Sequence, residues 1–218
     1  MTLKLIGAAL SPFVRKVRVA LAEKGLSYEH DPMMPFGVSD EYKRKHPLGK
    51  IPCLEVDGRP LPDSSAIVAY LEKSQPQPAL YPSDPFDHGR AVWFEEFADS
   101  GLINGTIVFF QQRLLQPIFF KKDPDEAALQ KAANETLPPL FDYLERELGD
   151  DDYLVGNRFT IADLATGTQF VNYRHGEGVV DAARWPKLAA YVDRVLGRPS
   201  FKGLIEEDQA GIRAFRGA

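Results

Sequence analysis

The chain is poor in the residues and runs that cross-link a protein or anchor it in a membrane. It has one cysteine among 218 residues, Cys53, so no disulfide can form within the chain. Such cysteine usage is typical of a reducing compartment. No apolar run approaches the roughly 20 residues that span a bilayer, and the first residues show no signal-peptide pattern. We therefore expect a cytoplasmic protein with no membrane partner.

Several motifs of common chemistries are also absent. The sequence has no G-x-x-x-x-G-K-[ST], G-x-G-x-x-G, H-E-x-x-H or G-x-S-x-G. One cysteine and four scattered histidines do not supply a standard zinc site, so we expect no metal. The net charge of −5 argues against nucleic acid as a partner.

The charge is unevenly distributed along the chain. Residues 1–80 carry eleven Lys and Arg against nine Asp and Glu, whereas the remainder carries fifteen against twenty-two. A slightly basic first part would suit a small anionic ligand. Random variation of the surface explains the same numbers equally well.

The first part of the chain alternates strand and helix patterns. Short apolar runs end at Gly or Pro, and between them the apolar residues keep helical spacing. Asp57-Gly58 is typical of a hairpin turn. In order, the patterns predict a strand, a helix, a strand, a helical turn, a hairpin and a helix, at residues 3–8, 12–24, 28–32, 40–45, 51–62 and 63–73.

Four prolines between residues 76 and 85 indicate a linker. No strand pattern persists after them. The spacing predicts helices at 86–115, ending near Pro117, at 123–148 with a kink at Pro138-Pro139, and at 160–173, 186–196 and 200–212. We therefore predict an α/β domain over residues 1–80 followed by an all-α domain over residues 86–218.

Thr160 and Asp163 have the spacing of a capping box, which starts a helix by satisfying its first backbone N–H groups. We assign these two residues to structure and not to catalysis.

Three pieces of the first domain together resemble a known family. They are Ser11-Pro12-Phe13-Val14-Arg15, Lys50-Ile51-Pro52 and Asp63-Ser64-Ser65-Ala66-Ile67. In order and spacing they resemble the thioredoxin-like domain of cytosolic glutathione transferases. The resemblance continues into the second domain through "FTIADL" and "WPKLAAYVDRVLGRPSF".

Within that family the chain is similar to the serine-type classes. The segment "SPFVRKVRVAL" most closely resembles tau-like and omega-like sequences, although omega-like members carry Cys where this chain has Ser11. The first predicted strand ends in "LIGAAL", without the tyrosine that other classes use there. The resemblance implies that Ser11 is catalytic and stabilises a thiolate. The alternative is that Ser11 only caps the helix that begins at Pro12.

The resemblance also implies a set of glutathione-binding residues. It implies a cis bond before Pro52 that turns the backbone of Ile51 toward the cysteinyl part of glutathione, with Phe13 beside Ser11 also in contact. A trans proline opening an edge strand is the alternative. Cys53 then points away from the ligand, as a small core thiol.

Two further groups are implied for the ends of glutathione. Asp63 and Ser64 would hold the γ-glutamyl part at a helix N-terminus. Asp63 stands where the family more often has Glu, and either residue is equally suited to be a simple helix cap. Lys50 would pair with the glycine carboxylate, with neighbouring cations between residues 43 and 46 as rivals.

The second domain should supply the electrophile site. Phe109, Phe110 and Arg113 lie in the aromatic segment "INGTIVFFQQRLLQPIFF" and are candidates for it. Packing in the core or in a dimer interface is the alternative for each of them. The family also implies a homodimer.

The resemblance implies a detoxification enzyme, a glutathione S-transferase that conjugates the thiolate to a hydrophobic electrophile. A glutathione-dependent isomerase or peroxidase is an alternative, because the same thiolate serves both reactions. A non-catalytic ligand-binding relative is another alternative.

Overall fold

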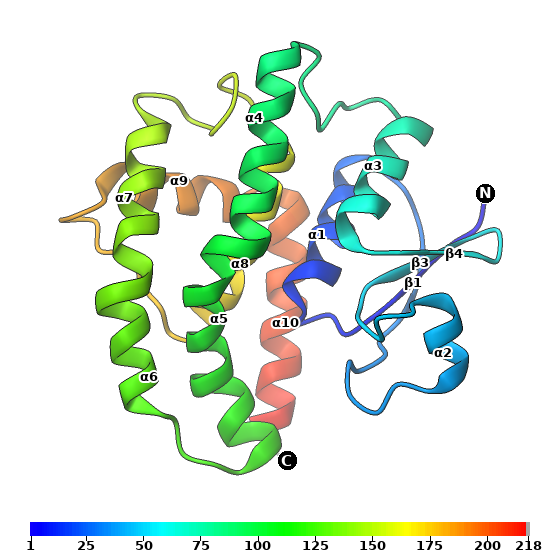
Figure 1. The fold of residues 1–218 in the computed structure, drawn as a ribbon, viewed down its shortest axis with the longest axis horizontal. Coiled ribbons are helices and arrows are strands. Elements are labelled where there is room, and N and C mark those ends of the chain that lie inside the picture. The colour runs from blue at the N-terminus through cyan, green and yellow to red at the C-terminus, as the bar shows by residue number, and fades with distance from the viewer. Residues whose placement is uncertain (217–218) are drawn as a thin grey trace. The chain divides into compact units, whose positions relative to one another are not determined.

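In the computed structural model, which describes residues 1–216, the chain divides into two units, Met1–Leu80 and Tyr81–Ala218. The first unit mixes strands and helices, and the second contains helices (Figure 1). This is the fold class that the sequence predicts, a small α/β thioredoxin-like domain followed by an all-α domain. The prediction of the fold class is confirmed.

A four-stranded mixed sheet forms the centre of the first unit. Its strands lie in the order β2-β1-β3-β4. β1 pairs in parallel with β2, and the β1–β3 and β3–β4 pairs are antiparallel. Leu5 on β1 lies opposite Leu54 on β3, and both side chains are fully buried. The strands are β1 (Leu3–Ile6), β2 (Glu29–Asp31), β3 (Cys53–Val56) and β4 (Arg59–Pro62).

Three helices complete this unit. α1 (Pro12–Glu23) and α3 (Ser64–Ser74) pack against each other, and the short α2 (Asp40–Lys45) lies apart from them (Figure 1). The apolar residues Val14, Val17 and Leu21 of α1 are fully buried, and because every residue from Val14 to Leu21 is buried, the helix is enclosed on all sides over about two turns. α1 ends before Gly25, whose φ of 64° suits glycine and stops the helix as predicted.

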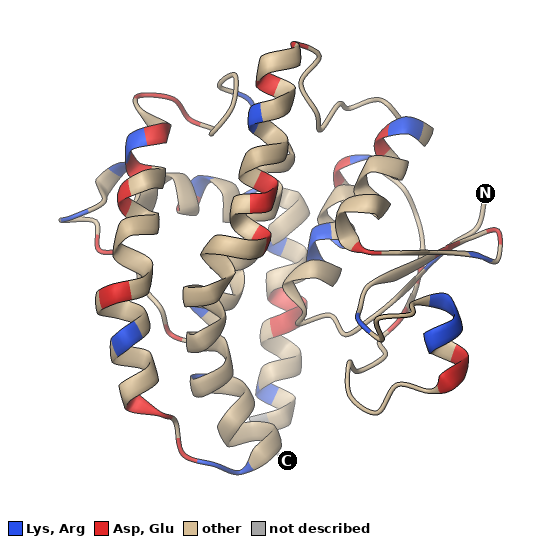
Figure 2. Ribbon diagram, in the orientation of Figure 1, with Lys and Arg blue, Asp and Glu red and all other residues tan. Residues whose placement is uncertain are grey.

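The short helix α2 has a polarised surface. Its first turn carries two acidic residues and its last turn three basic ones, which Figure 2 shows as red and blue ends. Both placements complement the helix dipole, because acidic groups stabilise the N-terminus and basic groups the C-terminus. Ser39 begins the helix, and its Oγ accepts from the backbone N–H of Tyr42 at 3.1 Å.

Two long helical runs open the second unit, and both contain π-helical segments. The first comprises α4 (Pro85–Glu96), η1 (Phe97–Leu102), α5 (Ile103–Phe110) and η2 (Gln111–Phe120). The second comprises α6 (Glu126–Lys131), η3 (Ala132–Thr136) and α7 (Leu137–Leu148). The second run ends at Leu148, as the sequence predicts, whereas the end of the first run and the start of the second differ from the prediction.

The positions of proline explain these differences. The predicted end near Pro117 is wrong, since η2 continues through Pro117 to Phe120 and stops where Lys121 adopts a φ of 52°. Proline lacks the N–H that an α-helical turn needs, and the wider π-helical bonding accommodates the gap. The second run begins at Glu126, after the cap Asp125, rather than at Asp123. Pro138 falls in the first turn of α7, where the missing N–H costs nothing.

The helix α8 (Ile161–His175) forms the core of this unit. All of its residues from Ile161 to Tyr173 are buried, and it packs against α4, α5 and α9 (Pro186–Leu196). Gly167 permits close packing there, because a Cβ at this position would lie 2.7 Å from Val195 Cγ1. The last helix is α10 (Pro199–Arg216).

Thr160 and Asp163 form the predicted capping box at the start of α8. The buried Asp163 carboxylate accepts from the backbone N–H groups of Leu154 at 2.9 Å and Thr160 at 2.8 Å, and from the hydroxyl of Tyr191 at 3.1 Å. Asp163 therefore joins the preceding loop, α8 and α9. Burial raises the pKa of its carboxyl to about 6, and the donated hydrogen bonds oppose that rise.

This raised pKa predicts how stability depends on pH. Between the ordinary carboxyl pKa and about 6, the folded protein binds a proton that the unfolded chain does not, so stability falls as pH rises through that range. The free energy of unfolding of wild type should therefore exceed that of Asp163→Asn, which does not titrate, by more at pH 4 than at pH 7. Urea unfolding of both proteins across that range measures this difference in free energy, and a difference that grows with pH would contradict the assignment.

Candidate functional site

Ser11 stands at the N-cap of α1. Its backbone is extended, and its Oγ accepts from the backbone N–H of Val14 at 3.4 Å. The capping interpretation is therefore confirmed. The hydroxyl hydrogen takes no part in this bond, so it can be donated to a ligand. Pro12 follows as the first helical residue, where its fixed φ favours the helix start.

The loop before β3 contains the predicted cis bond, between Ile51 and Pro52. The Pro52 carbonyl accepts from the backbone N–H of Asp63 at 3.3 Å, which joins this loop to the start of α3. Within residues 1–216, the backbone N–H and C=O of Ile51 have no hydrogen-bond partner. They are available to pair with an extended peptide in the manner of a strand edge.

Asp63 is the N-cap of α3 in a strained conformation. Its φ is 77°, which is uncommon for a residue with a side chain. Its Oδ1 accepts from the backbone N–H groups of Ser65 at 2.9 Å and Ala66 at 3.1 Å. The capping alternative is thus realised, and the exposed carboxylate keeps Oδ2 for another partner. Strained residues of this kind gather at ligand-binding sites.

Ser64 is the first residue of α3, and only 3% of it is exposed. Its hydroxyl has no hydrogen-bond partner among the residues that the structure describes. The next residue, Ser65, accepts at Oγ from the ammonium of the buried Lys16 at 2.8 Å. A positive charge from α1 therefore lies at the N-terminus of α3, where it adds to the helix dipole in favouring an anion.

Two of the cations that rival Lys50 as a partner for the glycine carboxylate pair with acidic side chains. Lys45 pairs with Glu55 at 2.7 Å, and this hydrogen bond raises the pKa of Lys45. Lys43 lies 3.4 Å from Asp40 on α2. The ammonium of Lys50 is exposed and makes no ion pair within residues 1–216, so Lys50 stays the predicted partner of a carboxylate.

Two other residues near the motif have structural environments. Cys53 is fully buried, and burial raises the pKa of its thiol to about 11, so it stays protonated near neutral pH. The interpretation of Cys53 as a core thiol is confirmed. Phe13 is half-buried at the start of α1, and its contact with a ligand stays a prediction.

The three electrophile-site candidates lie along α5 and η2. Phe109 packs edge-on against Tyr173, with ring centroids 4.8 Å apart, and only 4% of Phe110 is exposed. Arg113 makes a bidentate pair with Glu126, at 2.7 and 3.0 Å. Each candidate thus has a partner or a buried place within the helical unit. Their role toward a substrate stays a prediction.

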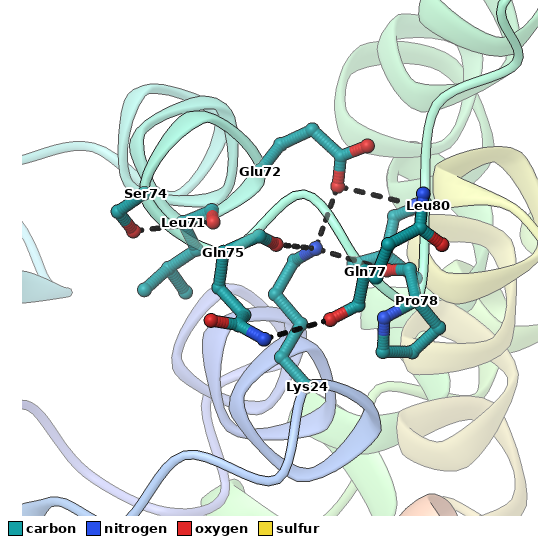
Figure 3. A network of polar contacts seen from close by, with 8 residues as sticks. All are labelled: Lys24, Leu71, Glu72, Ser74, Gln75, Gln77, Pro78 and Leu80. Carbon is teal, nitrogen blue, oxygen red and sulfur yellow. Dashed lines mark hydrogen bonds and ion pairs between the residues drawn. The ribbon is translucent and has the colours of Figure 1, made fainter.

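Lys24 connects the C-terminal ends of α1 and α3, the two helices whose N-termini carry the candidate site. Its side chain is fully buried and its ammonium donates to Glu72 at 2.7 Å, to the Gln75 carbonyl at 2.7 Å and to the Pro78 carbonyl at 3.0 Å (Figure 3). Glu72 in turn accepts from the backbone N–H of Leu80 at 3.1 Å. The end of α1 is thereby tied to the end of α3 and to the segment that follows it.

The first part of the proline-rich linker, through Leu80, is fixed by this network. The Lys24 ammonium binds the Pro78 carbonyl, Glu72 binds the N–H of Leu80, and Leu80 itself is buried. The bond between Gln77 and Pro78 is cis, which the sequence did not predict. No pattern in the sequence identified Lys24, because its role depends on carbonyl groups about 50 residues away.

Comparison with known proteins shows the family to which the chain belongs. Residues 5–79 match the glutathione S-transferase N-terminal domain, and residues 110–208 match the glutathione S-transferase C-terminal domain. A glutathione S-transferase from Methylobacterium radiotolerans, solved in complex with glutathione sulfonate, is 34% identical, with a TM-score of 0.75. The match covers 94% of this chain and 95% of that one. The chain belongs to the glutathione S-transferase family.

Two further proteins are similar to this chain over most of its length. The uncharacterized GST-like protein YibF of Escherichia coli is 29% identical over 204 residues, which cover 91% of this chain and 96% of YibF. The maleylacetoacetate isomerase of Pseudomonas aeruginosa is 28% identical over 193 residues, which cover 86% of this chain and 88% of the isomerase.

Residues 1–216 contain neither a helix that could span a membrane nor a cluster of metal ligands. No helix there is long and apolar enough to cross a membrane. No group of three or more His, Cys, Asp or Glu side chains within residues 1–216 is arranged to hold a metal ion.

Proposed function

We propose that this glutathione S-transferase family member conjugates glutathione to a hydrophobic electrophile, with Ser11 stabilising the glutathione thiolate. The observation that carries the proposal is the unpaired backbone of Ile51 beside the cis bond to Pro52. A peptide ligand can add its own N–H and C=O there, as one more strand adds to a sheet edge.

The groups of glutathione find complementary partners in the N-terminal unit. The γ-glutamyl carboxylate would bind the N-terminus of α3 and the free hydroxyl of Ser64, beside the charge of Lys16. The ammonium of the same residue would bind Oδ2 of Asp63. The cysteinyl backbone would pair with Ile51, and the glycine carboxylate with the exposed ammonium of Lys50. Phe13 completes the proposed contacts.

Thiolate formation is the step that the chain must favour. A free thiol has a pKa of about 8.5, so it is mostly protonated at neutral pH. In the proposed mechanism the Ser11 hydroxyl donates to the sulfur while its oxygen accepts from the N–H of Val14. This donated bond and the positive end of α1 could together lower the thiol pKa by about two units, which needs roughly 2.7 kcal/mol.

The proposed conjugation reaction needs no further cofactor. The thiol proton leaves to solvent, the sulfur lone pair forms a carbon–sulfur bond, and the electrophile loses its leaving group or gains a proton. Ser11 donates a hydrogen bond throughout and forms no covalent bond. We propose that Phe109, Phe110 and Arg113 contribute to electrophile binding and that the protein is a homodimer, which analytical ultracentrifugation would test.

A second candidate function is isomerisation, which the similarity to the Pseudomonas aeruginosa isomerase supports. A bound thiolate can add to a conjugated double bond, allow rotation and then leave. A peroxidase reaction would use the same thiolate, and a ligand-binding relative would use only the binding site. These alternatives differ in product and not in the proposed glutathione contacts.

An assay panel separates the candidates. Purified protein with glutathione is given a chlorodinitrobenzene, a cis-unsaturated diketo acid and an organic hydroperoxide, and the products are identified by mass spectrometry. We expect a glutathione conjugate from the first compound. Isomerised acid or reduced hydroperoxide without a conjugate would assign the alternative reaction, and glutathione binding without any product would favour the ligand-binding relative.

A further inference from the structure

The side chain of Tyr42 reaches from α2 to the loop that carries the proposed cysteinyl contact. Its hydroxyl donates to the backbone carbonyl of Lys50 at 2.7 Å. Only 5% of Tyr42 is exposed, so the bond is shielded from competing water. Burial also raises the pKa of Tyr42 above the ordinary tyrosine value, which keeps the hydroxyl protonated as a donor.

The Lys50 carbonyl and the Ile51 N–H belong to the same peptide group. This bond is trans, since the cis bonds of the described chain lie before Pro52 and Pro78. In a planar trans peptide the C=O and N–H point in opposite directions. A hydrogen bond that fixes the carbonyl therefore also fixes the direction of the Ile51 N–H. Accepting a bond at oxygen also strengthens the donor on the other side of the peptide.

Further contacts hold the Tyr42 side chain and the loop in place. The ring of Tyr42 stacks on His46, with centroids 6.2 Å apart and planes at 30°. The backbone N–H of His46 donates to the Tyr42 carbonyl at 2.9 Å, and the His46 carbonyl accepts from Gly49 at 2.8 Å. Gly49 has a φ of 62°, which suits glycine. Together with the Tyr42 hydroxyl, these bonds close the segment 42–50 into a compact loop.

We propose that Tyr42 is a positioning residue for glutathione, whose hydroxyl holds the Lys50–Ile51 peptide so that the Ile51 N–H points at the cysteinyl carbonyl of the ligand. This rests on the proposed function, in which Ile51 is the cysteinyl contact. It adds a residue that touches no substrate and acts only through the peptide plane. Removal of the Tyr42 hydroxyl should therefore weaken the binding of glutathione more than the binding of the electrophile.

The test compares Tyr42→Phe with wild type and with Tyr70→Phe, a control whose hydroxyl contacts Met1 Sδ on the surface of the same unit. Calorimetry with glutathione should give a Kd about fivefold weaker for Tyr42→Phe, since one hydrogen bond is lost, and no change for Tyr70→Phe. The KM for glutathione should rise in parallel, with kcat and the KM for the electrophile unchanged. A merely structural role would lower the melting temperature and leave KM alone.

The outcomes separate this inference from the proposed function. Wild type that binds no glutathione at millimolar concentration overturns the proposed function and the role of Tyr42 with it. Wild-type binding with an unchanged Kd in Tyr42→Phe overturns only the role of Tyr42. If Tyr42→Phe does not fold, NMR of labelled wild type decides. The Ile51 amide proton should then move downfield with glutathione, and an unmoved signal would overturn the inference.

Discussion

Ser11→Ala should lower kcat by roughly ten- to thirtyfold at pH 6 and should not lower it at pH 9. Well below both pKa values, a two-unit rise in the thiol pKa reduces the thiolate fraction about a hundredfold. The more basic thiolate is also more nucleophilic, which returns up to about eightfold. Above the raised pKa both proteins hold mostly thiolate, so the defect should disappear, and the more nucleophilic thiolate of the variant should react at least as fast as that of wild type. Steady-state rates with saturating glutathione across this pH range measure the effect.

The control for this prediction must separate chemistry from helix capping. Loss of an N-cap hydrogen bond costs about 1 kcal/mol of stability. Asp125 caps α6 through a bond of the same spacing, to the backbone N–H of Ala128 at 3.0 Å. Asp125→Ala should show a comparable loss of stability with an unchanged pH profile. A defect in Ser11→Ala that is the same at pH 6 and pH 9 would mean that Ser11 does not act on thiol ionisation.

Lys24→Met should destabilise the N-terminal unit by about 3 kcal/mol. Methionine fills the same space but removes the buried ammonium that donates to the Glu72 carboxylate and to two carbonyls, and breaking a buried pair in this way typically costs about 3–5 kcal/mol. Both tryptophans lie in the second unit, at 93 and 185, so their fluorescence does not report this loss. Hydrogen exchange of peptides from α1 and α3 does.

Two variants make this measurement interpretable. Lys43→Met removes an exposed cation that lies 3.4 Å from Asp40, and such surface pairs contribute at most about 1 kcal/mol. Its exchange should match wild type. Adding Glu72→Gln to Lys24→Met should recover part of the lost protection, because the carboxylate charge that loses its lysine is then removed as well. Unchanged exchange in Lys24→Met would show that the network in Figure 3 does not hold the two helices together.

Local patterns predict the elements of this fold well. The spacing of Val14, Val17 and Leu21 identifies buried positions of α1, and Thr160 with Asp163 identifies the start of α8. These signals succeed because each depends on residues within one or two turns of helix. The predicted end near Pro117 is wrong, since the π-helical bonding that carries a chain through proline leaves no simple pattern. The predicted start at Asp123 is wrong because Asp125 is the residue that caps the helix.

The candidate site is predictable where short motifs define it. Ser11, the cis bond before Pro52 and the start of α3 follow from motifs of a few residues, read as a family resemblance. Short motifs do not identify Tyr42 and Lys24, because each of these residues donates to backbone carbonyls that any residue could supply. A tyrosine or lysine at those positions gives no sign of its partner until the chain is folded.

The most direct test of the account is the pKa of the glutathione thiol when it is bound to the protein. The ultraviolet absorbance of the thiolate, followed by pH titration of the complex, gives this value for wild type and for Ser11→Ala. If Ser11 stabilises the thiolate, the midpoint for wild type should lie about two units below the free-thiol value of about 8.5, and it should return toward the free value in the variant. A wild-type midpoint at the free-thiol value would contradict this role of Ser11.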